Sequence, residues 1–172
     1  GDVYKRQGWE SMTQVFIGKA VTRSCNRLLI NEGVSNVENL GYYNGKFGPL
    51  NEMSIPMNDR VHWFGDGVYD AGPARNYKIF AIDEHIDRFF NSAELLEIEM
   101  HCTKQELKDL LNKLVKKVDT GSQFVYYQVT RGTGIRDHAF TEGPGNLWVM
   151  LKPAAISDGI EPIKLITEPT RP

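Results

Sequence analysis

Residues 64–88 read FGDGVYDAGPARNYKIFAIDEHIDR and combine turn, strand and helix signals in one short segment. Residues 65–67 are Gly-Asp-Gly, which leaves the backbone free to take a positive φ, so we expect a tight turn that leads into a strand. A short β-prone run follows from Lys78 to Ile82. Asp83 then supplies a candidate N-cap for a helix.

Two consecutive helices are expected after this segment. From Glu84 to about Glu97 the apolar residues recur at helical spacing. Thr103 and Glu106 form a capping box that starts the second helix, and Gly121 marks its stop. The apolar stripe of the second helix consists of Leu107, Leu110, Leu111, Leu114, Val115 and Val118.

Strands are expected on both sides of this helix pair. An Asn-Gly dipeptide between strand-forming residues predicts a hairpin at 42–47. Residues 124–130 and 147–151 are two further β-prone runs, joined by a polar loop with several glycines. Strands, two consecutive helices and strands again predict an α+β domain with a largely antiparallel sheet.

The composition narrows the classes of function. A chain of 172 residues with 41% hydrophobic residues is long enough for one globular domain with a real core. Its net charge of −2 does not favour binding to nucleic acid or to an anionic membrane, because both carry negative charge. No apolar run approaches the length of a membrane span and no signal-peptide pattern is found, so we expect a cytoplasmic protein. Cys25 and Cys102 are interpreted as reduced thiols, with neither a disulfide framework nor a metal site.

Arg88, on the first predicted helix, is a candidate ligand for an anion. Its guanidinium offers a planar fork that matches phosphate, and a helix is a stiff place to mount it. The alternative is an exposed arginine paired with Glu84 one turn earlier. His62, His85 and His101 fit no ligand or triad spacing and are interpreted as structural or surface residues.

The loop after residues 124–130 holds a second candidate site. Arg136 and His138 stand two residues apart in a glycine-flanked loop and are able to converge on one carboxylate, although such loops also occur as solvated connections. Tyr69, just after the Gly-Asp-Gly turn, is a third candidate, and half-buried packing is its alternative. The residues alone therefore indicate an α+β domain that binds a small anion.

Taken in order, these segments resemble the fold-type IV pyridoxal-phosphate-dependent aminotransferases, and within that family the D-amino-acid aminotransferases most closely. The resemblance runs from about Tyr42 to the end of the chain. Its most specific mark is Arg136-x-His138, which resembles the carboxylate-binding pair of the D-amino-acid enzymes. The other matching stretches are Tyr43-Asn44-Gly45, Asn58-Asp59-Arg60, Phe64-Gly65-Asp66-Gly67-Val68-Tyr69, Glu84-His85-Ile86-Asp87-Arg88, Ser92-Ala93 and Gln128-Val129-Thr130-Arg131-Gly132-Thr133.

The resemblance implies an activity, a cofactor and an assembly. The activity is transfer of an amino group between a D-amino acid and a 2-oxo acid with pyridoxal 5'-phosphate, whose phosphate Arg88 would bind. Tyr69, Arg136 and His138 would bind the substrate α-carboxylate, and in a homodimer the latter two would come from the partner chain. Branched-chain aminotransferase and aminodeoxychorismate lyase, of the same fold type, are alternatives. A non-catalytic binding or dimerisation module is an alternative of another class.

The resemblance also divides the chain. Residues 1–11 are interpreted as a cloning or sequencing scar or a disordered segment, and residues 12–40 as an N-terminal extension of unknown role. Residues 41–161 are interpreted as the N-terminal α+β domain, and residues 162–172 as the start of a truncated interdomain part. The family's Schiff-base lysine is expected beyond the chain end, so we expect this piece to be inactive alone.

One segment departs from the family pattern. Relatives continue a strand of branched residues after Tyr69, whereas this chain has Asp70-Ala71-Gly72-Pro73-Ala74. Proline removes a donor from the ladder, so we expect this strand to lie at an edge or to carry a bulge. Small residues so near the expected carboxylate site leave the preference for a substrate side chain open.

Overall fold

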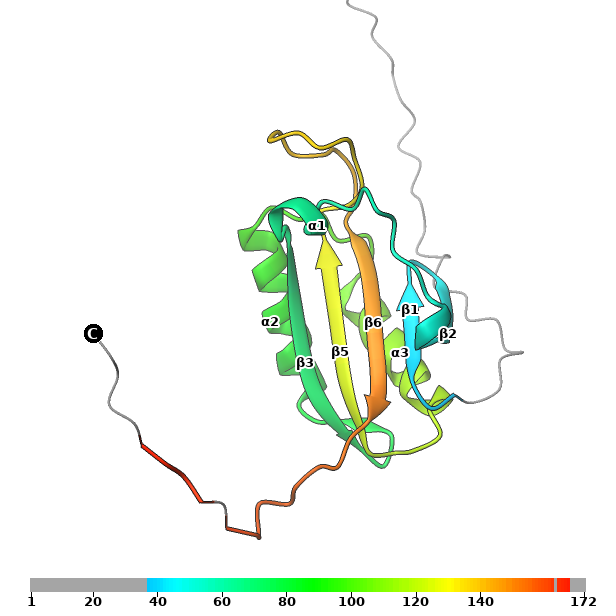
Figure 1. The fold of residues 1–172 in the computed structure, drawn as a ribbon, viewed down its shortest axis with the longest axis vertical. Coiled ribbons are helices and arrows are strands. Elements are labelled where there is room, and N and C mark those ends of the chain that lie inside the picture. The colour runs from blue at the N-terminus through cyan, green and yellow to red at the C-terminus, as the bar shows by residue number, and fades with distance from the viewer. Residues whose placement is uncertain (1–36, 163, 168–172) are drawn as a thin grey trace, which may run out of the picture.

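The structure, a computed structural model, describes residues 37–162 and 164–167 and consists of one antiparallel sheet with helices against it (Figure 1). The sheet has six strands in the order β2-β1-β6-β5-β3-β4. Helices α2 (Ile82–Leu95) and α3 (Lys104–Leu114) lie on one of its faces. This arrangement confirms the predicted α+β class. The strands are β1 (Leu40–Tyr43), β2 (Lys46–Pro49), β3 (Gly67–Arg75), β4 (Lys78–Ile79), β5 (Gln123–Thr130) and β6 (Asn146–Pro153).

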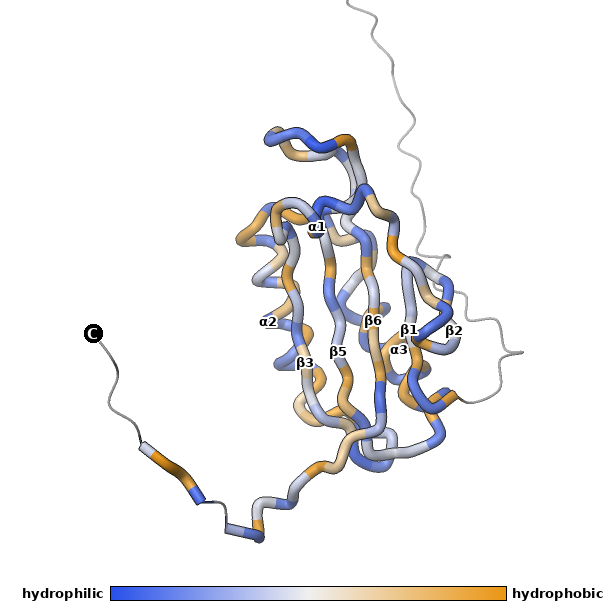
Figure 2. Tube along the Cα trace, in the orientation of Figure 1, coloured by the Kyte–Doolittle hydropathy of each residue, from blue (hydrophilic) through white to orange (hydrophobic). Residues whose placement is uncertain are grey.

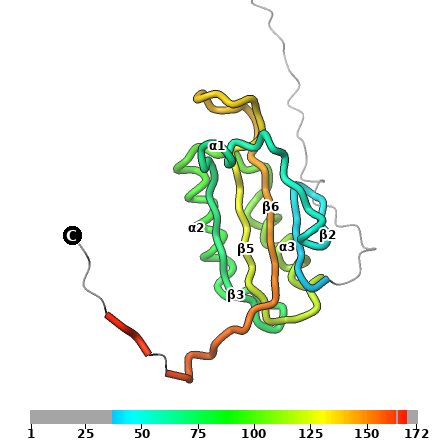
Figure 3. Tube along the Cα trace, in the orientation of Figure 1, coloured from blue at the N-terminus to red at the C-terminus, as the bar shows by residue number. Residues whose placement is uncertain are grey.

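The predicted hairpin is formed by β1 and β2. Asn44 and Gly45 both have positive φ, 43° and 95°, which is the combination that a two-residue turn needs to match the twist of its strands. The short 3-10 helix η2 (Leu50–Glu52) follows β2. On its other side β1 pairs with β6, so the first and last strands described lie side by side in the sheet (Figure 3).

The Gly-Asp-Gly turn is present, but its two glycines have different roles. A short helix that was not predicted, α1 (Val61–Phe64), ends at Gly65, whose left-handed φ of 62° suits glycine. Gly67, the first residue of β3, does not have a positive φ. A Cβ at this position would lie 2.8 Å from the carbonyl oxygen of Val129, so the close approach of β5 requires glycine there.

Strand β3 is an edge strand along most of its length. It pairs with β5 from Gly67 to Ala74, whereas β4 pairs only with Ala74 and Arg75. The amide of Arg131 donates to the carbonyl of Asp66, so by the alternation of an antiparallel ladder the odd-numbered amide positions of β3, Pro73 among them, face away from β5. The predicted edge position of this proline is therefore confirmed, and the sheet loses no internal hydrogen bond.

The start of α2 differs from the prediction. The helix begins at Ile82 and its N-cap residue is Ala81, with φ 45° and no capping side chain, so Asp83 is not the N-cap. The predicted β-prone run is a strand only over Lys78–Ile79, because the chain leaves β4 through a left-handed turn at Ala81. Asp83 instead lies in the first helical turn and forms an ion pair with Lys108 of α3.

The predicted capping box starts α3. The backbone amide of Glu106 donates to Thr103 Oγ1, and the backbone amide of Thr103 donates to Glu106 Oε2 at 2.8 Å. The α-helix ends at Leu114 and continues as a 3-10 turn, η3 (Val115–Lys117), so it stops before Gly121. The whole predicted stripe on this segment is buried.

The core lies between the two helices and the inner face of the sheet. It is formed mainly by Leu40, Tyr42, Ala74, Ile86, Phe89, Ala93, Ile98, Leu107, Leu110, Leu111, Leu114, Val115, Val118, Val125, Tyr127, Val129, Leu147, Val149 and Leu151. Cys102 is also buried, whereas Cys25 and the whole of the expected segment 1–11 fall outside the described residues. Within the described part of the chain, no helix is long and apolar enough to cross a membrane.

Candidate functional site

Tyr69 lies on the face of the sheet that does not carry α2 and α3. Its side chain is 67% exposed, so the alternative of half-buried packing does not describe it. Its ring stacks on Tyr126 of β5 at 5.3 Å between centroids, and Tyr126 in turn lies 5.3 Å from Trp148 of β6. This strip of three aromatic side chains crosses three neighbouring strands, with the first two rings stacked and the third tilted by 41°.

Arg88 reaches from α2 to the neighbouring strand β3. Its Nε and Nη2 donate to the two carboxylate oxygens of Asp70 at 2.8 and 2.9 Å. The sequence alternative, a pair with Glu84, is therefore wrong, because α2 packs against β3 and brings a buried carboxylate within reach. The side chain of Arg88 is 64% exposed, so the guanidinium is held at one edge and open to an anion at the other.

His85 completes the surroundings of Asp70. Its Nδ1 lies 2.7 Å from Asp70 Oδ1, and its side chain is 17% exposed, as a structural histidine would be. Gly72 makes room for this ring, because a Cβ there would approach His85 Nε2 to 3.0 Å. The unusual small residue two positions after Asp70 thus allows the histidine to pack over the strand.

Electrostatics at this site favour a charged Asp70. Burial alone would raise its pKa, but the hydrogen bonds from Arg88 and His85 hold the pKa of Asp70 below its ordinary value of 3.8. The buried hydroxyl of Tyr127 lies nearby, and burial together with the negative charge of Asp70 raises the pKa of this tyrosine well above its usual range. The pair of Asp70 and Arg88 is therefore charged at neutral pH beside a neutral phenol.

This lowered pKa predicts a pH dependence of stability. A carboxyl group with a lower pKa in the folded state stabilises the protein above its ordinary pKa of 3.8, and that contribution is lost as the pH falls through the lowered value. We expect Asp70→Asn to abolish this part of the decrease, measured as the free energy of urea unfolding between about pH 6 and about pH 2. The control is Asp87→Asn. The side chain of Asp87 is 65% exposed and pairs with Lys104, so this variant should keep the full decrease in stability at low pH. The same acid sensitivity in Asp70→Asn and the wild type would contradict the assignment.

Arg136 and His138 lie in the loop of residues 131–145, which projects beyond the end of the sheet (Figure 1). Both side chains are exposed. They have a common neighbour in Phe64 of α1: the guanidinium carbon of Arg136 is 5.3 Å from the centroid of that ring, and the His138 ring centroid is 5.7 Å from it. The projecting loop carries hydrophilic stretches with a few hydrophobic residues between them (Figure 2).

The structure brings two of the three predicted carboxylate ligands together. Arg136 and His138 share Phe64, whereas no hydrogen bond or ring contact in the described residues joins Tyr69 to either of them. The expectation that a partner chain supplies Arg136 and His138 to the site of Tyr69 remains a prediction.

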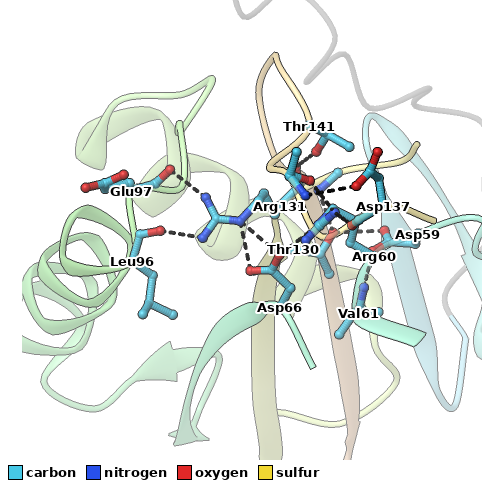
Figure 4. A network of polar contacts seen from close by, with 12 residues as sticks. Asp59, Arg60, Val61, Asp66, Leu96, Glu97, Thr130, Arg131, Asp137 and Thr141 are labelled. Atoms are coloured by element: carbon cyan, nitrogen blue, oxygen red, sulfur yellow. Dashed lines mark hydrogen bonds and ion pairs between the residues drawn. The ribbon is translucent and has the colours of Figure 1, made fainter. Parts of the chain in front are cut away.

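A buried polar cluster under the projecting loop was not predicted (Figure 4). Asp66, in the Gly-Asp-Gly turn, accepts hydrogen bonds from Nε of Arg60 and from Nε of Arg131, each at 2.9 Å. The side chains of Arg60, Arg131 and Asp66 are 3%, 7% and 11% exposed. We call these three residues the Asp66 cluster.

A second buried carboxylate, Asp59, lies beside the Asp66 cluster. It accepts from Thr130 Oγ1 at 2.8 Å, from Asn146 Nδ2 at 2.9 Å and from the amide of Val61 at 3.0 Å. Burial and the negative charge of Asp59 raise the pKa of Tyr43 to about 12. The Asn-Asp-Arg segment at 58–60 was noted only as part of the resemblance, and its spacing along the chain gives no sign that it contacts residues 66, 130 and 132.

Comparison with known sequences gives a family match and several relatives. The family model for amino-transferase class IV matches residues 67–171. The D-alanine aminotransferase of Staphylococcus haemolyticus is 35% identical over 99 residues, which are 58% of this chain and 35% of that protein. The D-alanine aminotransferase of Staphylococcus aureus (strain N315) is 37% identical over 101 residues, again 58% of this chain and 35% of that protein. The chain thus spans about a third of the length of these curated relatives.

Solved structures share the fold. A T.th. branched-chain amino acid aminotransferase complexed with N-(5'-phosphopyridoxyl)-L-glutamate has a TM-score of 0.59 and 22% identity, over 70% of this chain and 42% of that one. The branched-chain amino acid aminotransferase of Escherichia coli has a TM-score of 0.62 and 15% identity, over 69% of this chain and 42% of that one. Because the class IV family model matches more than half of the chain, and the sheet with its two helices has the fold of these enzymes, the chain belongs to the class IV amino-transferases.

Proposed function

We propose that the protein to which this chain belongs transfers an amino group between a D-amino acid and a 2-oxo acid with pyridoxal 5'-phosphate as cofactor. The observation that carries the proposal is that Arg136 and His138 both lie next to the ring of Phe64, in a loop whose sequence resembles the carboxylate-binding loop of D-amino-acid aminotransferases. The identity of 35–37% to D-alanine aminotransferases supports it.

Arg88 fits the phosphate of this cofactor. Asp70 holds the guanidinium through Nε and Nη2, which fixes its plane, while the rest of an exposed side chain offers N–H donors to an outside anion. When bound, pyridoxal phosphate supplies the electron sink that makes proton transfer at Cα of an amino acid feasible. The residues of this chain contribute the anchoring of its phosphate and the orientation of the substrate.

The carboxylate of the substrate would be bound by Tyr69, Arg136 and His138. Arginine supplies a bidentate fork, and histidine and tyrosine each add one donor. The carboxylate position relative to the cofactor plane determines which face of Cα presents its hydrogen, and so these residues would set the handedness of the substrate. Because no hydrogen bond or ring contact joins Tyr69 to the other two within the described residues, the proposal includes a homodimer in which the loop of one protomer reaches the site of its partner.

Branched-chain transamination is the second candidate, because the solved structures that share the fold carry the name branched-chain amino acid aminotransferase. The two structures named above are 22% and 15% identical to this chain, a level that speaks for the fold alone. The relatives with higher sequence identity carry the name D-alanine aminotransferase. The side-chain preference stays open, since Ala71 and Pro73 replace the branched residues expected on this strand.

Steady-state assays of the intact protein with paired D- and L-amino acids test the proposal. We expect D-alanine or D-glutamate to be a better substrate than L-leucine or L-valine, and Arg136→Ala to lower kcat/KM by about thirtyfold or more, as for other desolvated charge pairs. His138→Ala should cost less, because it removes one donor. Arg75→Ala removes the same charge at the far end of β3 and serves as control. A preference for L-leucine or L-valine would replace the proposal by the branched-chain function.

A further inference from the structure

The projecting loop that carries Arg136 and His138 is anchored by backbone contacts only at its base. The amide of Arg60 donates to the carbonyl of Gly132 at 2.9 Å, and the amide of Gly134 donates to the carbonyl of Asn58 at 3.0 Å. Beyond these contacts the loop is exposed, with Ile135 at 91% and Phe140 at 62% exposure. A pair of residues that binds one carboxylate must nevertheless keep a fixed separation, so the outer part of the loop needs a support of its own.

The side chain of Arg60 provides such a support. Its Nη1 donates to the carbonyl oxygens of Asp137 and Ala139 at 2.7 and 2.8 Å, the two residues on either side of His138. The other end of the guanidinium is fixed, because Nε is bound to Asp66 at 2.9 Å. With 3% exposure the side chain is shielded from water, so each of these charge-assisted contacts counts more than it would at the surface.

Phe64 links Arg60 to the two predicted ligands. The guanidinium carbon of Arg60 lies 4.5 Å from the Phe64 centroid, and that of Arg136 lies 5.3 Å from it. His138 packs against the same ring at 5.7 Å. One aromatic ring therefore contacts the supporting arginine and both loop residues, and the two guanidinium groups lie at distances at which a cation and an aromatic ring attract each other.

We propose that Arg60, together with Phe64, is a positioning residue that sets the affinity of the site for the substrate carboxylate. Arg60 touches no substrate itself; it holds the backbone on both sides of His138 and orders the ring on which Arg136 rests. The inference rests on the proposed function, since it takes Arg136 and His138 as the carboxylate ligands. In a homodimer this support would act on the partner's site.

Arg131 offers a matched control, because it is the other arginine of the Asp66 cluster. Its Nε is bound to the same carboxylate, but Nη1 and Nη2 donate to the carbonyls of Glu97 and Leu96 at the end of α2. Its guanidinium also lies over Phe140, a contact that a lysine ammonium is able to keep. Substitution by lysine therefore removes the guanidinium that binds Asp66 in both cases. Only Arg60→Lys also removes the hydrogen bonds to the two carbonyl oxygens around His138.

The first measurement is amide hydrogen exchange of the intact, cofactor-loaded protein. We expect Arg60→Lys to accelerate exchange at residues 135–140 by about tenfold or more, the loss that corresponds to one charge-assisted hydrogen bond. Arg131→Lys should accelerate exchange near residues 94–98 instead. Phe64→Leu, which keeps an apolar side chain, should act on the loop in the same direction as Arg60→Lys but more weakly. Equal loop exchange in Arg60→Lys and Arg131→Lys would overturn the proposal, because it would reduce Arg60 to a general contributor to stability.

The second measurement is carboxylate binding, with propionate as a probe that cannot react. Titration of propionate followed on the His138 ring by NMR should give a Kd about tenfold or more higher in Arg60→Lys, and KM for D-alanine should rise in parallel while kcat changes by less than about threefold. Unchanged propionate affinity in Arg60→Lys overturns this inference and leaves the proposed function standing. A wild-type protein that binds propionate but transaminates neither D- nor L-amino acids contradicts the proposed function and leaves the positioning role intact.

Discussion

Asp66→Asn is expected to lower the free energy of unfolding by about 3–5 kcal/mol, the cost of breaking a buried ion pair by removing one partner. The substitution keeps the size of the side chain and one acceptor oxygen, but it removes the only negative charge of the Asp66 cluster. Two arginine side chains, 3% and 7% exposed, would then lose the carboxylate that both of them bind. The change is measured as the shift of the urea midpoint at unchanged slope.

Asp87→Asn is the control for this prediction. It removes the same charge from an ion pair of 2.6 Å, but both partners are more than half exposed, and such pairs contribute about 0–1 kcal/mol. Similar losses in the two variants would mean that the Asp66 cluster is solvated in solution, contrary to its burial in the structure.

Arg88→Ala is expected to weaken the affinity for pyridoxal phosphate by about thirtyfold or more in the intact protein, because a charge-assisted contact to phosphate is lost. Equilibrium dialysis of the cofactor measures the effect. The substitution also leaves Asp70 with His85 as its remaining side-chain partner, so the urea midpoint is followed in the same samples.

Two comparisons separate cofactor binding from folding in this experiment. Arg75→Ala removes an exposed arginine from the same strand as Asp70 and should leave the affinity unchanged. Asp70→Asn keeps Arg88 but releases the carboxylate that fixes its plane, so we expect it to weaken cofactor binding less than Arg88→Ala does. Unchanged affinity in Arg88→Ala would restrict Arg88 to a role as the partner of Asp70.

The features that were predictable from the sequence are those set by neighbouring residues. Asn44-Gly45 specifies its turn because both residues tolerate positive φ, and Thr103 with Glu106 specifies a helix start because the two side chains bond to each other's backbone. Pro73 also predicted the position of its strand, because a residue without an amide hydrogen is accommodated only at an edge or a bulge of a sheet.

The features that escaped prediction depend on contacts between distant segments. Helix spacing offered Glu84 only as the alternative partner of Arg88, and the packing of α2 on β3 supplies Asp70 instead, 18 residues away. Asp83 is a suitable N-cap by residue type. The left-handed turn after β4 instead starts the helix earlier in the chain, at Ile82. The Asp66 cluster joins residues 65 positions apart, and no local pattern of charges reports such a contact.

The edge position of Pro73 has a further consequence, for self-association through the sheet. An open strand edge with a row of free amides invites another chain to add a strand, which is how native sheets start to aggregate. On the outward side of β3 one of those amides is missing at Pro73, and Ala74 and Arg75 are already paired with β4, whose first residue is Lys78. The opposite edge, β2, is four residues long and begins with Lys46 and ends with Pro49. Within residues 37–162 both borders of the sheet are thus poor templates for strand addition.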